Sequence, residues 1–267
     1  MIYSLGPKKP TIHKSAYVAP NATVSGDVTI EEGCAVLFGA VLVAEGAPMN
    51  IGANTVVMEN AVIKSSGGAA MQFPVSIGES CLIGPGAFLS GCTIEPGCFV
   101  AAGSKVFNNA HLEEKVSIAI GAIVQIGTRV PAQTRVPMQH IAFGNPAEIL
   151  PPGDAPRVHE RLNFSTDVFN VEKGPDAGAQ IAEQYSKFLR KAHAGERTLE
   201  RVSDEGGLKK VPAKGKASAG KPAGATRDEP PAQQSADVAK VLDVTFYELE
   251  EARIRREAAH KREGKRP

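Results

Sequence analysis

The sequence predicts an all-β solenoid in which short parallel strands coil around a narrow aliphatic interior. Three observations predict it. Branched aliphatic residues recur every six positions through most of residues 1–150, and the residue four positions after each of them is usually small. Tryptophan is absent and aromatic residues make up only 5% of the chain, so the interior has to be built from small aliphatic side chains. A period of six fits neither an α-helix nor a simple alternating strand, whereas three hexapeptides per coil fit a triangular solenoid.

The aliphatic series has twenty members, which predicts six to seven coils. It is broken after Leu42 and again after Ile63, and it slips by one residue after Leu89. Its members are Ile12, Val18, Val24, Ile30, Val36, Leu42, Ile51, Val57, Ile63, Ile77, Ile83, Leu89, Ile94, Val100, Val106, Leu112, Ile118, Val124, Val130 and Val136.

Small residues predict where the chain turns inward beside each aliphatic side chain. Cys34, Cys81, Cys98 and Thr93 fall in this inward slot, whereas Cys92 is expected beside a corner. Because a buried cysteine behaves as a small hydrophobic residue, we interpret these cysteines as structural filler.

Composition excludes several classes of protein. The net charge of +1 gives no overall field that would attract nucleic acid or a membrane surface. The first ten residues lack the apolar core of a signal peptide, and no apolar run approaches the length of a membrane span. The cysteines form no C-x-x-C pair. We therefore expect a cytoplasmic protein without a membrane span and without a nucleic-acid partner.

Segment boundaries follow from glycine, proline and charge. Residues 1–150 are predicted to form the solenoid, which the turn GNPAEIL (144–150) ends. The glycine-containing segment 64–76 is predicted to leave the coil, either as a loop that carries specificity or as a tolerated insertion. Residues 151–195 are predicted to be a connecting segment and a packing helix over 176–194, with Asp176 as its N-cap.

The remaining residues predict a tail. Residues 196–236 are rich in Lys, Ala, Gly and Pro and are predicted to be a disordered linker. Residues 237–267 keep a narrow apolar seam and are predicted to form a tethered amphipathic helix. This helix would either dock to a protein partner or to the solenoid, or stay partly formed in solution.

Four phrases within the repeats carry a resemblance to a known family. They are VSGDVTI (24–30), AVLFGAVLVAEGAPMNIG (35–52), IGPGAFLSGCTI (83–94) and GNPA (144–147). Together with the hexads, they resemble the γ-class carbonic anhydrases and their acyltransferase-like relatives among the hexapeptide-repeat proteins. The resemblance implies a left-handed parallel β-helix, a homotrimer and functional sites between its subunits.

The resemblance also implies a site that has lost its metal ligands. The three zinc-binding histidines of the family fall at Lys64, Pro85 and Ser90. The family's Arg-Gly-Asp falls at 43–45, so that Val43 and Glu45 line the expected pocket, and its Asn-x-Gln-Asp falls at 56–59, which brings Met58 and Glu59 there. Catalytic zinc needs about three ligands from His, Cys or carboxylate, so we expect no metal.

Lys64 suggests what occupies the vacated position. Its ammonium could replace the positive charge of the metal and face Glu45 and Glu59. The alternative is an ordinary exposed lysine at a corner of the solenoid.

Three functions are compatible with these features. The first is a zinc-free trimeric scaffold or binding protein, a pseudoenzyme that does not hydrate CO2. The second is an acyl-CoA-dependent acyltransferase that binds acetyl-CoA between subunits, for which Glu59, Lys64, Ser90 and His111 are weak catalytic candidates. The third is a hydrolase or other metal enzyme that uses Glu45 and Glu59. Whether the protein is an enzyme stays open at this point. We expect no cofactor under the first function and acetyl-CoA under the second.

Overall fold

The computed structural model describes residues 1–67, 71–201 and 208–210, all within one compact unit that spans residues 1–213. Residues 211–267 lie outside the described residues. The predicted tethered helix at 237–267 and most of the predicted linker therefore lie outside the described residues as well.

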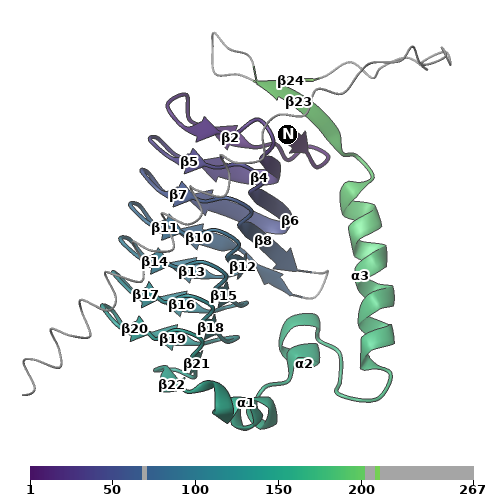
Figure 1. Cartoon of the computed structure of the whole chain (residues 1–267). Coiled ribbons are helices and arrows are strands. Elements are labelled where there is room, and N and C mark those ends of the chain that lie inside the picture. The colour runs from purple at the N-terminus through teal and green to yellow at the C-terminus, as the bar shows by residue number, and fades with distance from the viewer. Residues whose placement is uncertain (68–70, 202–207, 211–267) are drawn as a thin grey trace, which may run out of the picture. The chain divides into compact units, whose positions relative to one another are not determined.

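Parallel strands form the three faces of a left-handed β-helix (Figure 1). One face is a seven-stranded sheet with one strand per coil. Its strands are β3 (Tyr17–Val18), β5 (Ala35–Val36), β7 (Val56–Val57), β11 (Leu82–Ile83), β14 (Phe99–Val100), β17 (Ser117–Ile118) and β20 (Arg135–Val136). Another face has eight strands, because β1 (Ile2–Ser4) adds one at the N-terminal end, so the solenoid has about eight turns and the prediction of six to seven coils was slightly low.

Two long strands, β4 (Thr23–Ile30) and β6 (Val41–Ile51), each run through both of the other faces. We call one of these the pocket face; it contains β1 (Ile2–Ser4), β8 (Val62–Gly67), β12 (Phe88–Ser90), β15 (Lys105–Val106), β18 (Ile123–Val124) and β21 (Ile141–Phe143). We call the other the polar face; it contains β2 (Thr11–Ile12), β10 (Val75–Ile77), β13 (Thr93–Ile94), β16 (His111–Leu112) and β19 (Arg129–Val130).

The aliphatic series forms the interior, as the period of six predicts. Eighteen of its twenty members are buried, and Ile12 and Val18 in the first coil are half-buried. Cys34, Cys81 and Cys98 occupy the inward slot and are buried. The prediction was wrong at the register slip: Cys92 is buried in the slot, and Thr93 points outward and is exposed. The repeat between Leu89 and Ile94 is one residue shorter than the others, so its inward slot is position 92 instead of position 93.

The corners between faces explain how a six-residue period turns the chain. In most hexads, the residue three positions before the interior aliphatic has a positive φ, which favours Gly and tolerates Asn. Gly39 (φ 72°) and Asn60 (φ 56°) hold this position in successive coils. A Cβ on Gly39 would lie 2.2 Å from Oδ1 of Asn60, so the glycine also lets consecutive corners stack closely.

The parallel ladder of the pocket face ends at β21. β21 turns back through GNPA into β22 (Glu148–Leu150), and the two strands pair antiparallel, which stops the parallel ladder. The predicted excursion at 64–76 is a hairpin-like extension of β8, whose end pairs antiparallel with β9 (Gln72–Phe73).

Short helices follow the solenoid: η1 (Pro152–Asp154), α1 (Ala155–Arg161), α2 (Phe164–Phe169) and α3 (Ala177–His193). The predicted packing helix is confirmed as α3, which contacts β6 and α2 (Figure 1). Its predicted apolar stripe is the half-buried side of the helix, formed by Ile181, Tyr185, Phe188, Leu189 and Ala192. Asp176 occupies the N-cap position, but its side chain makes no capping hydrogen bond. None of the helices in the described ranges is long and apolar enough to cross a bilayer.

The prediction of a disordered linker from residue 196 was wrong for its first residues. β23 (Arg197–Arg201) pairs antiparallel with β1, and β24 (Leu208–Lys210) pairs with β23. β1 is at the edge of the pocket face, where unpaired backbone groups favour the addition of a strand. Because α3 returns the chain to the first coil, local composition could not reveal this long-range pairing.

Candidate functional site

Three residues predicted from the resemblance are neighbours on the pocket face. Val43 of β6 is in register with Lys64 of β8, and Lys64 is in register with Ser90 of β12. Parallel pairing without offset places their side chains in one row across three coils. The structure therefore brings together residues that lie 21 to 47 positions apart in the sequence.

The Lys64 ammonium forms the centre of a polar cluster. Its Nζ lies 3.0 Å from Oε2 of Glu45, whose side chain is only 11% exposed. The hydroxyl of Tyr185, on α3, donates to the same carboxylate oxygen over 2.7 Å. The Tyr185 ring also lies against the ammonium, with Nζ 5.2 Å from the ring centroid. Lys64 thus forms an ion pair with Glu45 and packs against Tyr185, so it is not an ordinary exposed lysine at a corner of the solenoid.

The pKa values of Lys64 and Tyr185 are both raised, but for different reasons. Burial alone would lower the pKa of Lys64, but its contacts with Tyr185 and Glu45 outweigh this effect and raise the pKa. Burial raises the pKa of the Tyr185 phenol, and the nearby Glu45 carboxylate adds to that rise. Lys64 is therefore a cation, and Tyr185 a neutral donor, throughout the neutral pH range.

The cluster continues along α3 toward the first coil. Nε2 of His193 lies 3.8 Å from Oε1 of Glu45, and Nδ1 lies 3.3 Å from Oε2 of Glu196. The hydroxyl of Ser25, buried on β4, donates to Glu196 over 3.4 Å. The carboxylate of Glu45 therefore links the solenoid to the middle and to the C-terminal end of the packing helix.

A cavity of about 160 Å³ opens beside Lys64 and Ser90. It is lined from the solenoid by Lys64, Ser66, Phe88, Ser90, Phe107 and Asn108, and from the helices by Phe164, Val168, Phe169 and Tyr185. The predicted excursion contributes Ser66 to this lining. Two residues of segment 64–76, Lys64 and Ser66, therefore line the cavity.

The floor of the cavity is polar and buried. The Asn108 amide donates to Oγ of Ser66 over 2.6 Å, and Ser66 and Ser90 are hydrogen-bonded over 3.4 Å between their Oγ atoms. Asn108 is 2% exposed and Ser90 is 5% exposed. This pairing satisfies polar side chains that would otherwise be buried without partners.

Three other predicted residues lie outside this cavity. Glu59 and Pro85 occupy equivalent positions at the corner between the seven-stranded face and the pocket face: the amide of Gly86 donates to the carbonyl of Glu59, and that of Gly103 to the carbonyl of Pro85. Met58 precedes this corner and is half-buried. Of the two predicted carboxylates, Glu45 alone is paired with Lys64 among the described contacts.

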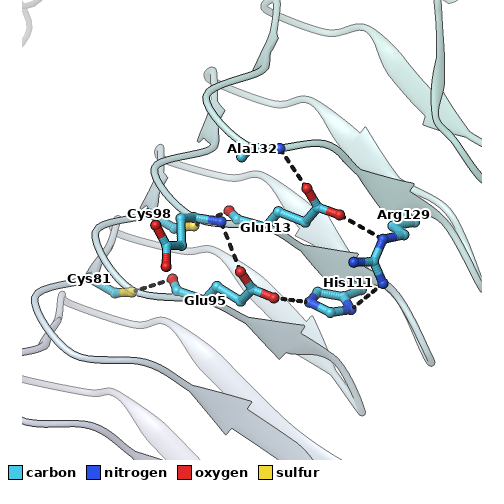
Figure 2. Close-up of polar contacts among 8 residues, drawn as sticks. Cys81, Glu95, Cys98, His111, Glu113, Arg129 and Ala132 are labelled. Atoms are coloured by element: carbon cyan, nitrogen blue, oxygen red, sulfur yellow. Dashed lines mark hydrogen bonds and ion pairs between the residues drawn. The ribbon is translucent and has the colours of Figure 1, made fainter.

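His111 belongs to a separate network on the polar face (Figure 2). Its Nε2 donates to Oε1 of Glu95 over 2.6 Å, and its Nδ1 lies 3.3 Å from Nη1 of Arg129, which can donate to it. Arg129 also donates to Glu113 over 2.6 Å. Both ring nitrogens are thus occupied, which leaves neither free to take a proton from a substrate.

The glutamates of this network also support the corners. Glu95 accepts from the amide of Glu114, and Glu113 accepts from the amide of Ala132, so each carboxylate binds the backbone of the next coil (Figure 2). The thiols of Cys81 and Cys98 donate to the carbonyls of Glu95 and Glu113. We conclude that this network stabilises the stack of coils and is distinct from the site around Lys64.

The residues at the vacated positions do not fit zinc. A protonated lysine repels a cation, Ser90 offers a neutral hydroxyl that is already hydrogen-bonded, and proline has no donor atom in its side chain. Within the described ranges, no group of three or more His, Cys, Asp or Glu side chains has an arrangement that could hold a metal ion.

Sequence reasoning missed most of the helical side of the site. Tyr185 was placed on the apolar stripe of α3, but its hydroxyl contact with Glu45 depends on where the helix packs. Phe164, Val168 and Phe169 lie on α2, a six-residue helix with no repeat to predict it. Asn108 follows β15 at a corner, where asparagine alone is an ordinary residue.

The fold and the hexads define a hexapeptide-repeat β-helix protein. Gamma carbonic anhydrase 1 of Arabidopsis thaliana mitochondria is 30% identical over 197 residues, which cover 70% of this chain and 68% of that protein. The carbonic anhydrase of Geobacillus kaustophilus (strain HTA426) is 27% identical over 114 residues, which cover 43% of this chain and 60% of that protein. The chain belongs to the γ-carbonic anhydrase family.

Two further comparisons do not bear on this assignment. The hexapeptide transferase family protein of Anaplasma phagocytophilum is 19% identical, with a TM-score of 0.39, over 72% of this chain and 95% of that one. No family model matches the chain.

Proposed function

We propose that this chain is a zinc-free γ-carbonic-anhydrase-like protein, a trimeric scaffold or binding protein that does not hydrate CO2. The observation that carries the proposal is the ion pair of Lys64 with Glu45. An ammonium stands where the first zinc-binding histidine is expected, and a nearby carboxylate already neutralises it. The site is therefore electrostatically complete without a metal.

The chemistry of hydration supports the same proposal. A catalytic zinc lowers the pKa of its bound water to about 7, and this supplies the nucleophile at neutral pH. None of Lys64, Pro85 and Ser90 supplies an imidazole, thiolate or carboxylate. Lys64 cannot act as the base either, because its raised pKa keeps it protonated.

An apolar corner supports self-assembly. Phe38, Ile120 and Met138 occupy the same corner position in different coils and are 51%, 39% and 46% exposed. Pro85 lies in the same column, and Glu59 is its charged member. A row of exposed apolar side chains along one edge of a rigid prism fits the surface of a second copy of the chain.

Metal analysis of the purified full-length protein, combined with its mass in solution and a CO2 hydration assay, tests the proposal. We expect a mass of three chains, substoichiometric zinc and no hydration above the buffer rate. About one zinc per chain together with CO2 turnover would overturn it.

The acyltransferase alternative is tested in the same preparation. His111 lies on the polar face, whereas Lys64 and Ser90 lie on the pocket face, so the catalytic candidates are not assembled in one site. We expect acetyl-CoA to leave the melting temperature unchanged, whereas a saturable increase would favour that alternative. Docking of residues 237–267 to a protein partner, and a cytoplasmic location, stay predictions.

A further inference from the structure

The cavity beside Lys64 concentrates the aromatic residues of an aromatic-poor chain. The sequence contains ten Phe, four Tyr and no Trp. Five of these fourteen rings line this one cavity: Phe88, Phe107, Phe164, Phe169 and Tyr185. The solenoid interior uses none of the five, because it is built from aliphatic residues. This concentration suggests a site for an apolar ring.

The five rings come from two sides. Phe88 and Phe107 contact each other on the pocket face, with centroids 6.1 Å apart. On the helical side, the Phe169 centroid lies 5.7 Å from that of Phe164 and 5.6 Å from that of Tyr185, both in edge-on arrangements. Phe164 is 48% exposed, so the lining retains apolar surface in water that a bound ring would cover.

The size of the cavity limits the ligand. An apolar cavity of about 150 Å³ holds one benzene molecule. The cavity here has a volume of about 160 Å³ and therefore accommodates a single six-membered ring with one small substituent. A pantetheine chain or a nucleotide would not fit within it.

The polar groups determine which substituent fits. An asparagine side chain offers four hydrogen-bonding positions, and the Asn108 amide uses one of them, toward Ser66, among the described contacts. The Lys64 charge is already neutralised by Glu45. A carboxylate on the ligand would be repelled by the nearby carboxylate of Glu45. A neutral hydroxyl or carbonyl on the ligand would avoid this repulsion and could form hydrogen bonds with the polar side chains of the cavity.

We propose that this cavity binds a small neutral aromatic molecule that carries one hydroxyl or carbonyl group. The ring lies between the solenoid pair of phenylalanines and the aromatic residues of α2 and α3. The polar group is hydrogen-bonded at the floor formed by Ser66, Ser90 and Asn108. This inference rests on the proposed function, because it requires the position beside Lys64 to be free of metal.

Titration calorimetry on the full-length protein, with phenol, benzene and benzoate as probes, tests the proposal. We expect saturable binding of phenol with a Kd at or below about 1 mM. Benzene, which lacks the hydrogen bond, should bind about fivefold more weakly. Benzoate should bind more weakly than phenol. Absence of saturable phenol binding, or tighter binding of benzoate than of phenol, would overturn the inference.

Two variants locate the binding. Ser90→Leu fills the floor of the cavity and removes a polar partner, so we expect at least about a tenfold loss of phenol affinity. Ser76→Leu makes the same change at an exposed serine on β10 and should bind phenol like the wild type. Equal affinity in a folded Ser90→Leu protein would contradict the assignment.

Nuclear Overhauser contacts in the wild-type protein give a test that does not depend on the folding of any variant. Phenol ring protons should contact Phe107 and Phe169, and contacts exclusively elsewhere would overturn the site. Zinc analysis of the same sample separates the two proposals. Failure to bind phenol in metal-free protein overturns this inference alone, whereas stoichiometric zinc overturns the proposed function as well.

Discussion

The Nζ atom of Lys64 lies 3.0 Å from Oε2 of Glu45, where the family resemblance placed the first zinc ligand. The carboxylate is shared with the Tyr185 hydroxyl of α3. One charge pair thus neutralises the vacated position and joins the solenoid to the packing helix.

Lys64→Met should destabilise the fold by about 1 to 3 kcal/mol, because it leaves the largely buried Glu45 carboxylate without its cation. Urea unfolding measures the change. Because the two residues contact each other, combining it with Glu45→Gln in a double-mutant cycle should give a non-additive result. The control is Lys187→Met, which breaks an exposed ion pair with Glu183 and should leave stability unchanged. Equal effects of the two lysine substitutions would show that the buried pair has no special role.

Alkaline pH should weaken the fold through the same cluster. The pKa values of Lys64 and Tyr185 are both raised, so the folded state binds both protons more tightly than the unfolded state. Their stabilising contribution is complete below the unfolded pKa values, near 10, and is lost as pH rises through the folded values. The free energy of unfolding should therefore fall above about pH 10, and less steeply in Lys64→Met/Tyr185→Phe protein. Parallel pH curves for the two proteins would contradict this account.

Restoring the three imidazoles should restore a metal site. The triple variant Lys64→His/Pro85→His/Ser90→His should bind about one zinc per chain in the proposed trimer. The histidine at position 85, on the corner of one copy, would meet those at positions 64 and 90 of its neighbour, and a water would complete a tetrahedral site. Elemental analysis after dialysis measures it. A matched control carries Ala102→His, one coil further along the corner, in place of Pro85→His and should retain no zinc. A folded triple variant without zinc would mean that the mapping of these positions is wrong.

Gly26 should resist substitution. Its φ is 85°, and a Cβ there would lie 2.5 Å from the backbone oxygen of Ala44. Gly26→Ala is therefore expected to lower the free energy of unfolding by about 2 to 4 kcal/mol. Gly153→Ala adds a methyl group in open space at a negative φ and serves as the control. A smaller loss for Gly26 than for Gly153 would rule out this explanation.

The apolar corner should hold copies of the chain together. Ile120→Glu places a charge among the exposed apolar residues of this column and should reduce the proposed trimer to smaller species at micromolar concentration. Thr93→Glu puts the same charge on the polar face and should remain trimeric. Sedimentation velocity distinguishes the two. A trimeric Ile120→Glu protein would place the interface elsewhere.

The period of six determined the fold. Each coil repeats the same local requirement, an interior aliphatic and a small inward residue, so Val36 or Leu112 could be placed from sequence spacing alone. The packing helix was predictable for the same reason, because its stripe from Ile181 to Ala192 has the helical period. The register slip at Cys92 was misplaced because a one-residue deletion does not show which residue of the coil is missing.

The tertiary structure determined which side chains come into contact where the helices pack against the solenoid. Sequence spacing could nominate Lys64 and Glu45, but only the packing of α3 brings Tyr185 to that pair. The tertiary structure also shows that Glu59 and Pro85 lie outside the cavity and that His111 lies on another face. The aromatic residues of α2, which the sequence did not predict, line the cavity. A repeat fixes which side of a strand a residue occupies, because that is a local property. Which side chains then share a cavity depends on contacts between segments that are distant in the chain, and no local period encodes them.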